Sequence, residues 1–212
     1  MPRDQRESFF TKIGASSEER ELFERFDAAL KATQDHTNLI ARSSWDERWE
    51  RHYLDSTQIF DLLPRAAVRL LDIGSGGGFP GIPLAILAST RMPNLKLTLC
   101  DSVGKKARFL ADVVAACGLK NTSVLAVRVE NHRFPERSDV VTARAVTALD
   151  GLIGHAERHL SPDGVLVFPK GRRAQQEVDE AAKRWSFQLE KRPSITDPEA
   201  SILLIRSPER IR

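Results

Sequence analysis

A glycine-rich turn constrains the fold of this chain more than any other feature. The segment RLLDIGSGGGFPGIP, residues 69–83, contains five of the twelve glycines in the 212-residue sequence. It follows a short hydrophobic run and precedes a helix start marked by prolines, the strand–turn–helix order of an α/β sheet. Glycine lacks a Cβ atom and tolerates positive φ, so a turn crowded with glycines indicates that another group approaches its backbone. We therefore expect a ligand at this turn.

Short apolar segments recur after the turn, and segments long enough for a helix separate most of them. The apolar segments are VRLLDI, LKLTLC, TSVLAV, DVVTAR and GVLVFP. Strands that alternate with helices predict right-handed crossovers and a mostly parallel sheet. The tail segments WSFQLEKR and ASILLIRS predict two more strands with no helix between them. The expected fold is α/β and Rossmann-like, with a seven-stranded, mostly parallel sheet and an antiparallel edge, as in class I methyltransferases.

The first 64 residues follow a helical pattern instead. In SSEERELFERFDAALKATQDHTN the apolar residues recur at helical spacing, and Ser16 or Ser17 is a candidate N-cap. SSWDERWERHYLDSTQIFDLLP repeats this pattern with Ser44 as its candidate N-cap. We predict a helical N-terminal extension, residues 1–64, and a sheet domain, residues 65–212, that together form one structural unit.

The charge of the chain is uneven. Residues 1–64 contain 9 Lys and Arg against 13 Asp and Glu, whereas residues 65–212 contain 23 against 16. The basic excess therefore lies in the same part of the chain as the glycine turn. Cationic side chains supply the sequence-independent part of nucleic-acid affinity, so this distribution favours a polyanionic partner.

The sequence shows no sign of export, a membrane span or a metal site. No segment approaches the ~20 apolar residues that cross a bilayer. The N-terminus, MPRDQRESFF, lacks the apolar run of a signal peptide. Cys100 and Cys117 form no CxxC pair and have no histidine at a ligand spacing, so we expect reduced core thiols. These features predict a cytoplasmic protein without a metal.

Two ligands fit the glycine pattern. Gly76, Gly78 and Gly81 satisfy G-x-G-x-x-G, the fingerprint of dinucleotide sites. Asp72, with Gly74, Gly76 and Gly78, satisfies D-x-G-x-G-x-G after a hydrophobic strand. The second pattern is typical of S-adenosylmethionine sites in Rossmann-like methyltransferases. Both patterns use the same turn.

The residues around the turn favour S-adenosylmethionine. A carboxylate at Asp72 would repel a pyrophosphate but suits a cofactor with a cationic amino group. Pro80 and Pro83 remove N–H donors from the helix start that would bind a pyrophosphate. Asp101 ends the second strand, where it can bind a ribose diol under either interpretation. We predict S-adenosylmethionine as the cofactor, with an NAD-dependent oxidoreductase as the alternative.

The acceptor of the methyl group is indicated by what the sequence lacks. After the fourth strand, SDVVTARAVTAL has no [N/D]-P-P-[Y/F] element for exocyclic adenine nitrogen and places Arg144 there instead. Neither cysteine lies where the nucleophile of a 5-methylpyrimidine enzyme is needed. A site without a nucleophile or general base fits an acceptor with a free lone pair, such as guanine N7. Methyl transfer to such an atom requires mainly that the base is correctly positioned in a pocket that excludes water.

Several motifs then occur in a family-specific order. LDIGSGGGFPGIPLAI, LCDSVGKKARFL, RVENHRF, DVVTARAVTAL and FPKG, with TNLIARSSWDERWERHYLDS before them, resemble the bacterial ribosomal small-subunit methyltransferase G family, formerly glucose-inhibited division protein B. The resemblance extends from about residue 36 to residue 171. It implies methylation of N7 of a guanine in the 530 loop of 16S rRNA. A methyltransferase of the same fold that acts on another substrate stays an alternative.

The resemblance also implies roles for single residues. Gly74 and Phe79 would line the cofactor site. Val129 and Glu130 would flank the adenine ring, and Arg144 would project toward the cofactor and the target base. Together with Gly76 and Asp101, which the residue patterns assign, these form the predicted cofactor site. The positions expected to face RNA or shape the pocket are Asn38, His52, Lys105, Lys106 and Lys170. The expected partner is 16S rRNA or the 30S subunit, bound by a monomer.

Overall fold

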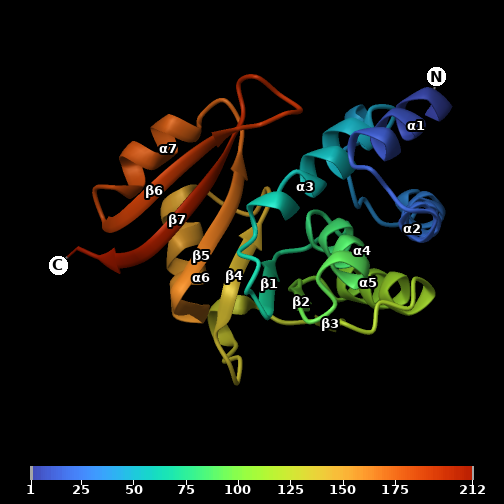
Figure 1. Ribbon diagram of the computed structural model, residues 1–212. Helices are drawn as coiled ribbons and strands as arrows, with labels where there is room; N and C mark the ends of the chain where they lie inside the picture. The colour runs from blue at the N-terminus through green and yellow to red at the C-terminus, as the bar shows by residue number, and fades with distance from the viewer. Residues whose placement is uncertain (1, 212) are drawn as a thin grey trace.

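The computed structural model describes residues 2–211 and contains a seven-stranded sheet (Figure 1). The strand order is β3-β2-β1-β4-β5-β7-β6. Neighbouring strands from β3 to β5 are parallel, and β7 runs antiparallel to both β5 and β6. The predicted sheet is confirmed, with its antiparallel strand second from the edge. The strands are β1 (Arg69–Ile73), β2 (Lys96–Cys100), β3 (Thr122–Leu125), β4 (Ser138–Ala143), β5 (Leu160–Lys170), β6 (Trp185–Pro193) and β7 (Ser201–Arg210).

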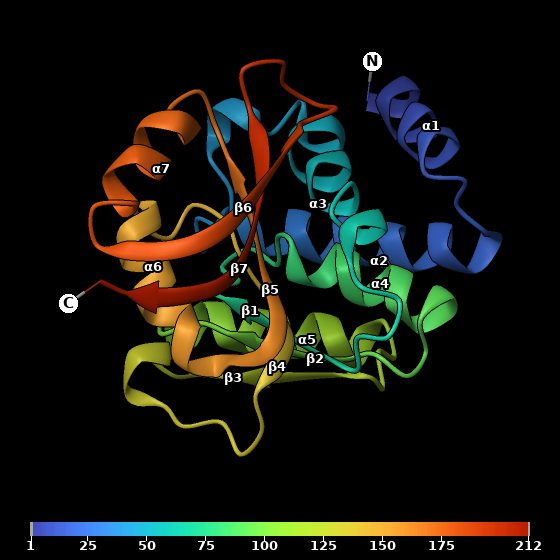
Figure 2. The same ribbon diagram turned by 60° about the vertical axis from the view of Figure 1, so that its left-hand side comes forward.

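Helices cover both faces of the sheet (Figures 1 and 2). One face is covered by α4 (Gly81–Arg91) and α5 (Gly104–Ala116), and the other by α6 (Leu149–Ala156) and α7 (Ala174–Ala181). Successive strand residues point to opposite faces, so a strand buried on both sides is continuously apolar. Leu70 accordingly packs in the core with α4 and α5, and Leu71 packs in the core with α6 and α7.

The N-terminal segment is helical, but its second half is broken into short turns. Ser16 is the N-cap of the long helix as predicted: its hydroxyl accepts the Glu19 N–H, and the Glu19 carboxylate accepts the Ser16 N–H. The elements are α1 (Pro2–Lys12), α2 (Ser17–Gln34), η1 (Arg42–Ser44), the π-helical turn η2 (Trp49–Leu54), α3 (Asp55–Thr57) and η3 (Phe60–Leu62); two further short turns, η4 (Val129–Asn131) and η5 (Glu157–His159), lie in the sheet domain.

Ser44 is not an N-cap, contrary to the sequence prediction. It lies inside η1, whose N-cap is Ala41, and its hydroxyl donates to the Ala41 carbonyl at 2.8 Å. The same hydroxyl lies 2.7 Å from His52 Nε2. The side chain is therefore used in a contact within the extension and not to begin a helix.

The extension and the sheet share one hydrophobic core. Phe26 of α2 and Tyr53 of η2 are completely buried, in the same cluster as Ile82 of α4 and Leu97 of β2. Aromatic rings dominate this junction; Trp49 stacks on Tyr53 with ring centroids 4.3 Å apart. The predicted boundary at residue 64 stays a prediction. Within residues 2–211, every helix is too short or too polar to cross a bilayer.

Candidate active site

Four of the five turn glycines are crowded by atoms of the protein itself. A Cβ atom at Gly77 would lie 2.7 Å from the Leu39 carbonyl oxygen. A Cβ atom at Gly78 would lie 2.9 Å from the Phe26 ring, and Gly81 is crowded in the same way by β1 and β2. The close approach that the glycine content indicated is therefore made by protein atoms, which come from the N-terminal extension at Gly77 and Gly78. A Cβ atom at Gly74 would likewise lie 2.7 Å from the Val146 side chain, so Gly76 alone of the five is uncrowded.

Gly74 and Gly76 lie at the carboxyl ends of β1 and β2, the edge at which open α/β sheets form a ligand crevice. Their φ angles are +65° and +53°, a backbone conformation that residues with a Cβ atom rarely adopt. The Gly76 N–H donates to Asp101 Oδ2 at 2.9 Å, and the Val103 N–H donates to Asp101 Oδ1 at 2.8 Å. A Cβ atom at Gly76 would make only ordinary van der Waals contacts, the nearest being with the Gly74 carbonyl oxygen at 3.7 Å. The carboxylate of Asp101 is thus held in one orientation beside the partly exposed Gly76.

This crevice fits S-adenosylmethionine better than a dinucleotide. The oriented carboxylate of Asp101 keeps lone pairs for hydroxyl donors such as those of a ribose. A pyrophosphate would need free N–H donors at the start of α4. That start is buried, its N-cap is Pro80, and the Ile82 N–H already donates to the Gly78 carbonyl at 2.8 Å. Among the described residues, the helix start offers a phosphate no accessible donor.

Val129 and Glu130 lie in η4, which follows β3. Val129 is buried, whereas Glu130 is partly exposed and lies 3.8 Å from Arg128. The negative charges of Asp101 and Glu130 both act on the Cys100 thiol at the end of β2. The contact of Val129 and Glu130 with an adenine ring stays a prediction.

The crevice contains no reactive thiol. Burial raises the pKa of Cys100 to about 12, with a smaller contribution from neighbouring carboxylates. Cys117 is also buried and lies behind α2, 3.7 Å from the Leu22 carbonyl. Both cysteines are core thiols, as predicted. In the described part of the chain, no three His, Cys, Asp or Glu side chains are grouped as metal ligands.

Asp72 lies beneath the turn and not in the crevice. Its side chain is fully buried; Oδ1 accepts the Thr142 hydroxyl at 2.9 Å and Oδ2 has no hydrogen-bond partner. Burial raises its pKa to about 6, and the Thr142 hydrogen bond opposes this rise. The expectation that this carboxylate meets a cationic amino group is not met, because protein atoms cover it. Its visible role is to connect β1 to β4.

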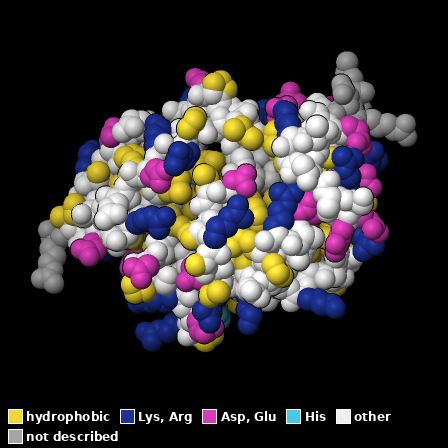
Figure 3. Space-filling view, viewed as in Figure 1, with side chains coloured by type: hydrophobic (Ala, Val, Ile, Leu, Met, Phe, Trp, Pro, Cys, Tyr) yellow, Lys and Arg dark blue, Asp and Glu magenta, His cyan; other side chains and the backbone are white. Residues whose placement is uncertain are grey.

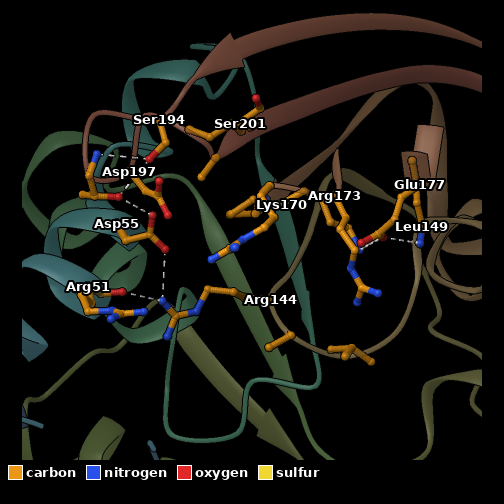
Figure 4. Close-up of a pocket in the computed structure, with 18 of the residues that line it drawn as sticks. Arg51, Asp55, Arg144, Leu149, Lys170, Arg173, Glu177, Ser194, Asp197 and Ser201 are labelled. Carbon is orange, nitrogen blue, oxygen red and sulfur yellow. Dashed lines mark hydrogen bonds and ion pairs between the residues drawn. The ribbon is translucent and has the colours of Figure 1, made fainter. Parts of the chain in front are cut away.

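Arg144 follows β4 and reaches across to the extension (Figure 4). Its Nη2 donates to His52 Nδ1 at 2.6 Å, and its Nη1 donates to the Asp55 carboxylate and the Arg51 carbonyl, both at 3.1 Å. The guanidinium carbon lies 5.3 Å from the centroid of the Phe79 ring. Burial lowers the pKa of Arg144, and the charge of Asp55 opposes this effect. The positive charge of Arg144 is thus stabilised by the Asp55 carboxylate, by two neutral acceptors and by the Phe79 ring.

Phe79 and His52 form the base on which Arg144 lies. The Phe79 ring is 4 % exposed and packs between Phe26, Tyr53 and His52 with centroid distances of 5.1 to 5.2 Å. It reaches the site through Arg144, so direct contact with the cofactor stays a prediction. Burial, followed by the charges of Arg144 and Arg51, lowers the pKa of His52 to about 3. His52 is therefore neutral at ordinary pH.

A cleft of about 1130 Å³ opens beside Arg144. Its walls are η2, the loop after β4, the start of α7 and the β6–β7 connection. Figure 4 shows Arg51, Asp55 and Arg144 on one side, and Arg173, Glu177 and Leu149 on the other. In Figure 3 this face is hollowed, with hydrophobic side chains in the hollow and both basic and acidic side chains around it. The cleft lining accordingly includes acidic residues such as Glu47 and Glu50 as well as basic ones such as Arg172.

Lys170 lies in the cleft wall but is already paired. Its ammonium donates to Glu177 Oε2 at 2.8 Å and to the Thr147 carbonyl at 3.0 Å. The same Glu177 oxygen accepts the Leu149 N–H at 2.9 Å. Lys170 therefore fixes the loop after β4 against α7, and a contact between Lys170 and RNA stays a prediction.

The other predicted RNA residues lie apart from Arg144. Asn38 is exposed next to Leu39, which contacts the glycine turn. Lys105 and Lys106 lie in the first turn of α5, just beyond Asp101, and none of the described residues forms an ion pair with them. Of the five predicted RNA residues, the structure brings only His52 into contact with the predicted cofactor residues.

The comparisons with known proteins agree with one another. The family model for rRNA small subunit methyltransferase G matches residues 19–203. This chain belongs to the rRNA small subunit methyltransferase G family. The family resemblance seen in the sequence motifs is therefore confirmed over nearly the whole chain.

Methyltransferase G relatives are similar along their full length. The protein named ribosomal RNA small subunit methyltransferase G from Ruegeria sp. (strain TM1040) is 45% identical over 196 residues, 91% of this chain and 94% of its own. The protein of that name from Rhodospirillum centenum is 41% identical over 195 residues, 92% of this chain and 87% of its own. Among solved structures, the glycopeptide N-methyltransferase MtfA complexed with S-adenosylmethionine is 9% identical, covers 74% of this chain and 95% of its own, and has a TM-score of 0.60. This last likeness concerns the fold alone.

Four residues of the cluster around Arg144 were not predicted as site residues: Ser44, Arg51, Asp55 and Thr196. His52 and Asp55 are three residues apart, a spacing that places side chains on one helical face. That spacing could have drawn attention to Asp55. Thr196 gave no sequence signal, because its hydroxyl donates to Asp55 across 141 residues, at 2.9 Å.

Proposed function

We propose that this chain transfers the methyl group of S-adenosylmethionine to N7 of a guanine in the 530 loop of 16S rRNA. Family membership over residues 19–203 supports the reaction and the class of RNA. The oriented Asp101 carboxylate beside the partly exposed Gly76 supports the cofactor. When bound there, S-adenosylmethionine supplies an electrophilic methyl group on a sulfonium.

The ionisable groups around the crevice support an acceptor atom that has no proton to lose. His52 has a pKa of about 3 and both ring nitrogens are engaged, so it is a poor general base. Asp72 is covered, and Cys100 has a pKa of about 12. Guanine N7 carries an in-plane lone pair and no hydrogen, so methylation there requires orientation and desolvation only.

The observation that carries the proposal is the place of Arg144 between crevice and cleft. It follows β4, the neighbour of the strand that leads into the glycine turn. Its described partners use two N–H groups on Nη1 and one on Nη2, which leaves the Nε–H and one Nη2–H. These donors suit guanine O6, which lies next to N7. The cleft then receives the base after it has left its stack.

The test is methyl transfer to rRNA of small subunits from cells that lack the gene. We expect label from S-adenosylmethionine in one guanine, with cleavage by borohydride and aniline at that site, the chemical signature of N7-methylguanosine. Arg144→Ala should lower kcat by about 10²-fold, in the range for loss of an electrostatic donor. Arg25→Ala, on the exposed face of α2, is the matched control.

Thermal unfolding with ligands tests the alternative. S-adenosylhomocysteine should raise the melting temperature and NAD should not. Stabilisation by NAD alone, or label on metabolites and none on rRNA, would overturn the proposal. The proposed monomer, and the choice between 30S subunits and free rRNA, are tested by light scattering and by competition between the two substrates.

A further inference from the structure

The contact between Arg144 and His52 fixes the position of the histidine proton. A guanidinium has only N–H donors, so His52 Nδ1, 2.6 Å from Arg144 Nη2, must accept. In the neutral ring the single proton then lies on Nε2. Arg144 therefore selects one tautomer of His52.

Ser44 selects the same tautomer from the other side of the ring. Its hydroxyl donates to the Ala41 carbonyl at 2.8 Å, so its oxygen is left to accept from His52 Nε2 at 2.7 Å. The hydrogen bonds run in one direction, from Arg144 to His52, from His52 to Ser44, and from Ser44 to the backbone. Because Ser44 and Arg144 both require the same tautomer of His52, the imidazole has a defined orientation.

Asp55 binds Nη1 of the guanidinium, and two side chains orient Asp55: Gln58 at the end of α3 and Thr196 in the β6–β7 connection. Its Oδ2 accepts from Arg144 Nη1 at 3.1 Å, while its Oδ1 accepts from Gln58 Nε2 and Thr196 Oγ1, both at 2.9 Å. The chain also adopts a left-handed φ of +56° at Ala145, directly after the arginine. A non-glycine residue keeps such a conformation only where its surroundings enforce it.

We propose that Ser44, His52 and Asp55 are positioning residues that orient Arg144, so that its Nε–H and remaining Nη2–H point at the acceptor base. The inference rests on the proposed function for the identity of that base. The orientation follows from geometry, because three acceptors from η2 and α3 together allow the guanidinium one orientation. These acceptors are the His52 ring, the Asp55 carboxylate and the Arg51 carbonyl. A neutral His52 is essential, because an imidazolium would repel the cation it now accepts from.

A first test reads the His52 tautomer directly and needs no substrate. Long-range ¹H–¹⁵N spectra of the ring should show a proton on Nε2 and none on Nδ1 between pH 6 and 8. Arg144→Ala and Ser44→Ala should each allow a mixture of tautomers. A wild-type ring protonated on Nδ1, or on both nitrogens, would overturn the proposal.

A second test separates positioning from structural support by kinetics. His52→Asn keeps an acceptor oxygen near the place of Nδ1, whereas His52→Gln places its amide near Nε2 and leaves Arg144 without that acceptor. We expect kcat to fall about tenfold or more in His52→Gln and about threefold or less in His52→Asn, because misplacement of a reacting or orienting group lowers rate steeply. The KM for S-adenosylmethionine should stay within about twofold in both.

Matched controls exist within the chain. Asp27→Asn removes the charge from another partly buried ion pair of the extension, that with Arg48 at 2.7 Å, whose residues do not line the cleft. Ser89→Ala removes a hydroxyl that donates only to a carbonyl three residues earlier, as Ser44 does to Ala41. Both should lower the melting temperature and leave kcat unchanged.

The outcomes are distinct. Equal loss of kcat in His52→Asn and His52→Gln, or an equal loss in Asp27→Asn, would show a merely structural role and sink the inference. A wild-type protein that shows the expected tautomer but labels no rRNA would contradict the proposed function and leave the positioning of Arg144 intact.

Discussion

Asp72 and His52 both lose contact with water on folding, yet their pKa values move in opposite directions. Burial raises the pKa of Asp72 to about 6 and lowers that of His52 to about 3. Between pH 3.8, the ordinary pKa of the carboxyl group, and about pH 6, the folded protein binds a proton at Asp72 that the unfolded chain releases. Between about 3 and 6.5 it lacks a proton at His52 that the unfolded chain binds. The two contributions to the pH dependence of stability therefore oppose each other.

Asp72→Asn should stabilise the protein at neutral and alkaline pH. In the wild type the stability contributed by protonated Asp72 is complete below about pH 4 and is lost as pH rises through 6. The isosteric amide stays neutral, so the free energy of unfolding should rise by up to about 3 kcal/mol at pH 8, falling to nothing near pH 4. Urea unfolding across this range measures it. A gain that does not change with pH would contradict the assigned pKa.

His52→Asn should make the protein more resistant to acid. The wild type keeps the full stability associated with neutral His52 above pH 6.5 and loses it as pH falls toward 3. One such proton changes the free energy of unfolding by at most about 1.4 kcal/mol per pH unit, and the variant removes this dependence on pH. Unfolding curves at pH 7, 6 and 5 give the comparison. His36→Asn, at an exposed position, should keep the wild-type slope.

At the scale of single elements, the glycine turn is shaped by its neighbours in the fold. Gly77→Ala should destabilise the protein by about 1–3 kcal/mol, the range for overpacking, because the new methyl group would meet the Leu39 backbone at 2.7 Å. Gly104→Ala, at the start of α5, meets nothing within 4 Å and should be neutral or slightly stabilising. Thermal unfolding of both variants tests this, and equal effects would contradict it.

The elements of the sheet were predictable because each is encoded locally. Apolar runs, the helix segments between them and the capping box at Ser16 all depend on residues near one another in sequence. The residues 42–62 were not predictable in the same way, since their helical spacing is overridden by tertiary contacts. Ser44 bonds His52 where a helix cap was expected, and η2 winds as a π-helical turn. Such turns occur often at functional sites.

The site was predictable only where a residue belongs to a local motif. Gly76 and Asp101 follow from the strand–turn pattern, and the structure joins them at 2.9 Å. The contact of His52 with Arg144 was not predictable, because 92 residues separate them. From sequence alone, the need for glycine at positions 77 and 78 is attributed to a ligand. The structure shows that Leu39 and Phe26 of the extension lie where the Cβ atoms of these residues would be, and these contacts too are distant in sequence.

At the scale of the whole molecule, the shared core predicts one cooperative unfolding transition. Trp49 lies in the extension and Trp185 in β6, so tryptophan fluorescence can report on either part. Trp185→Phe leaves probes only in the extension, and a Trp45→Phe, Trp49→Phe double variant leaves one only in the sheet. In each protein the fluorescence midpoint should coincide with that of far-UV circular dichroism. Separate midpoints would show that the extension unfolds independently.

The bond between Asp55 and Thr196 has a consequence for how the protein is made. It joins residues 141 positions apart, and β7, which lies between β5 and β6, is the last strand in the chain. Synthesis runs from the N-terminus, so the extension emerges long before the segment that orients its aspartate. A partly synthesised chain that lacks Thr196 therefore lacks the hydroxyl that orients Asp55, and the proposed site is incomplete until that segment has been made.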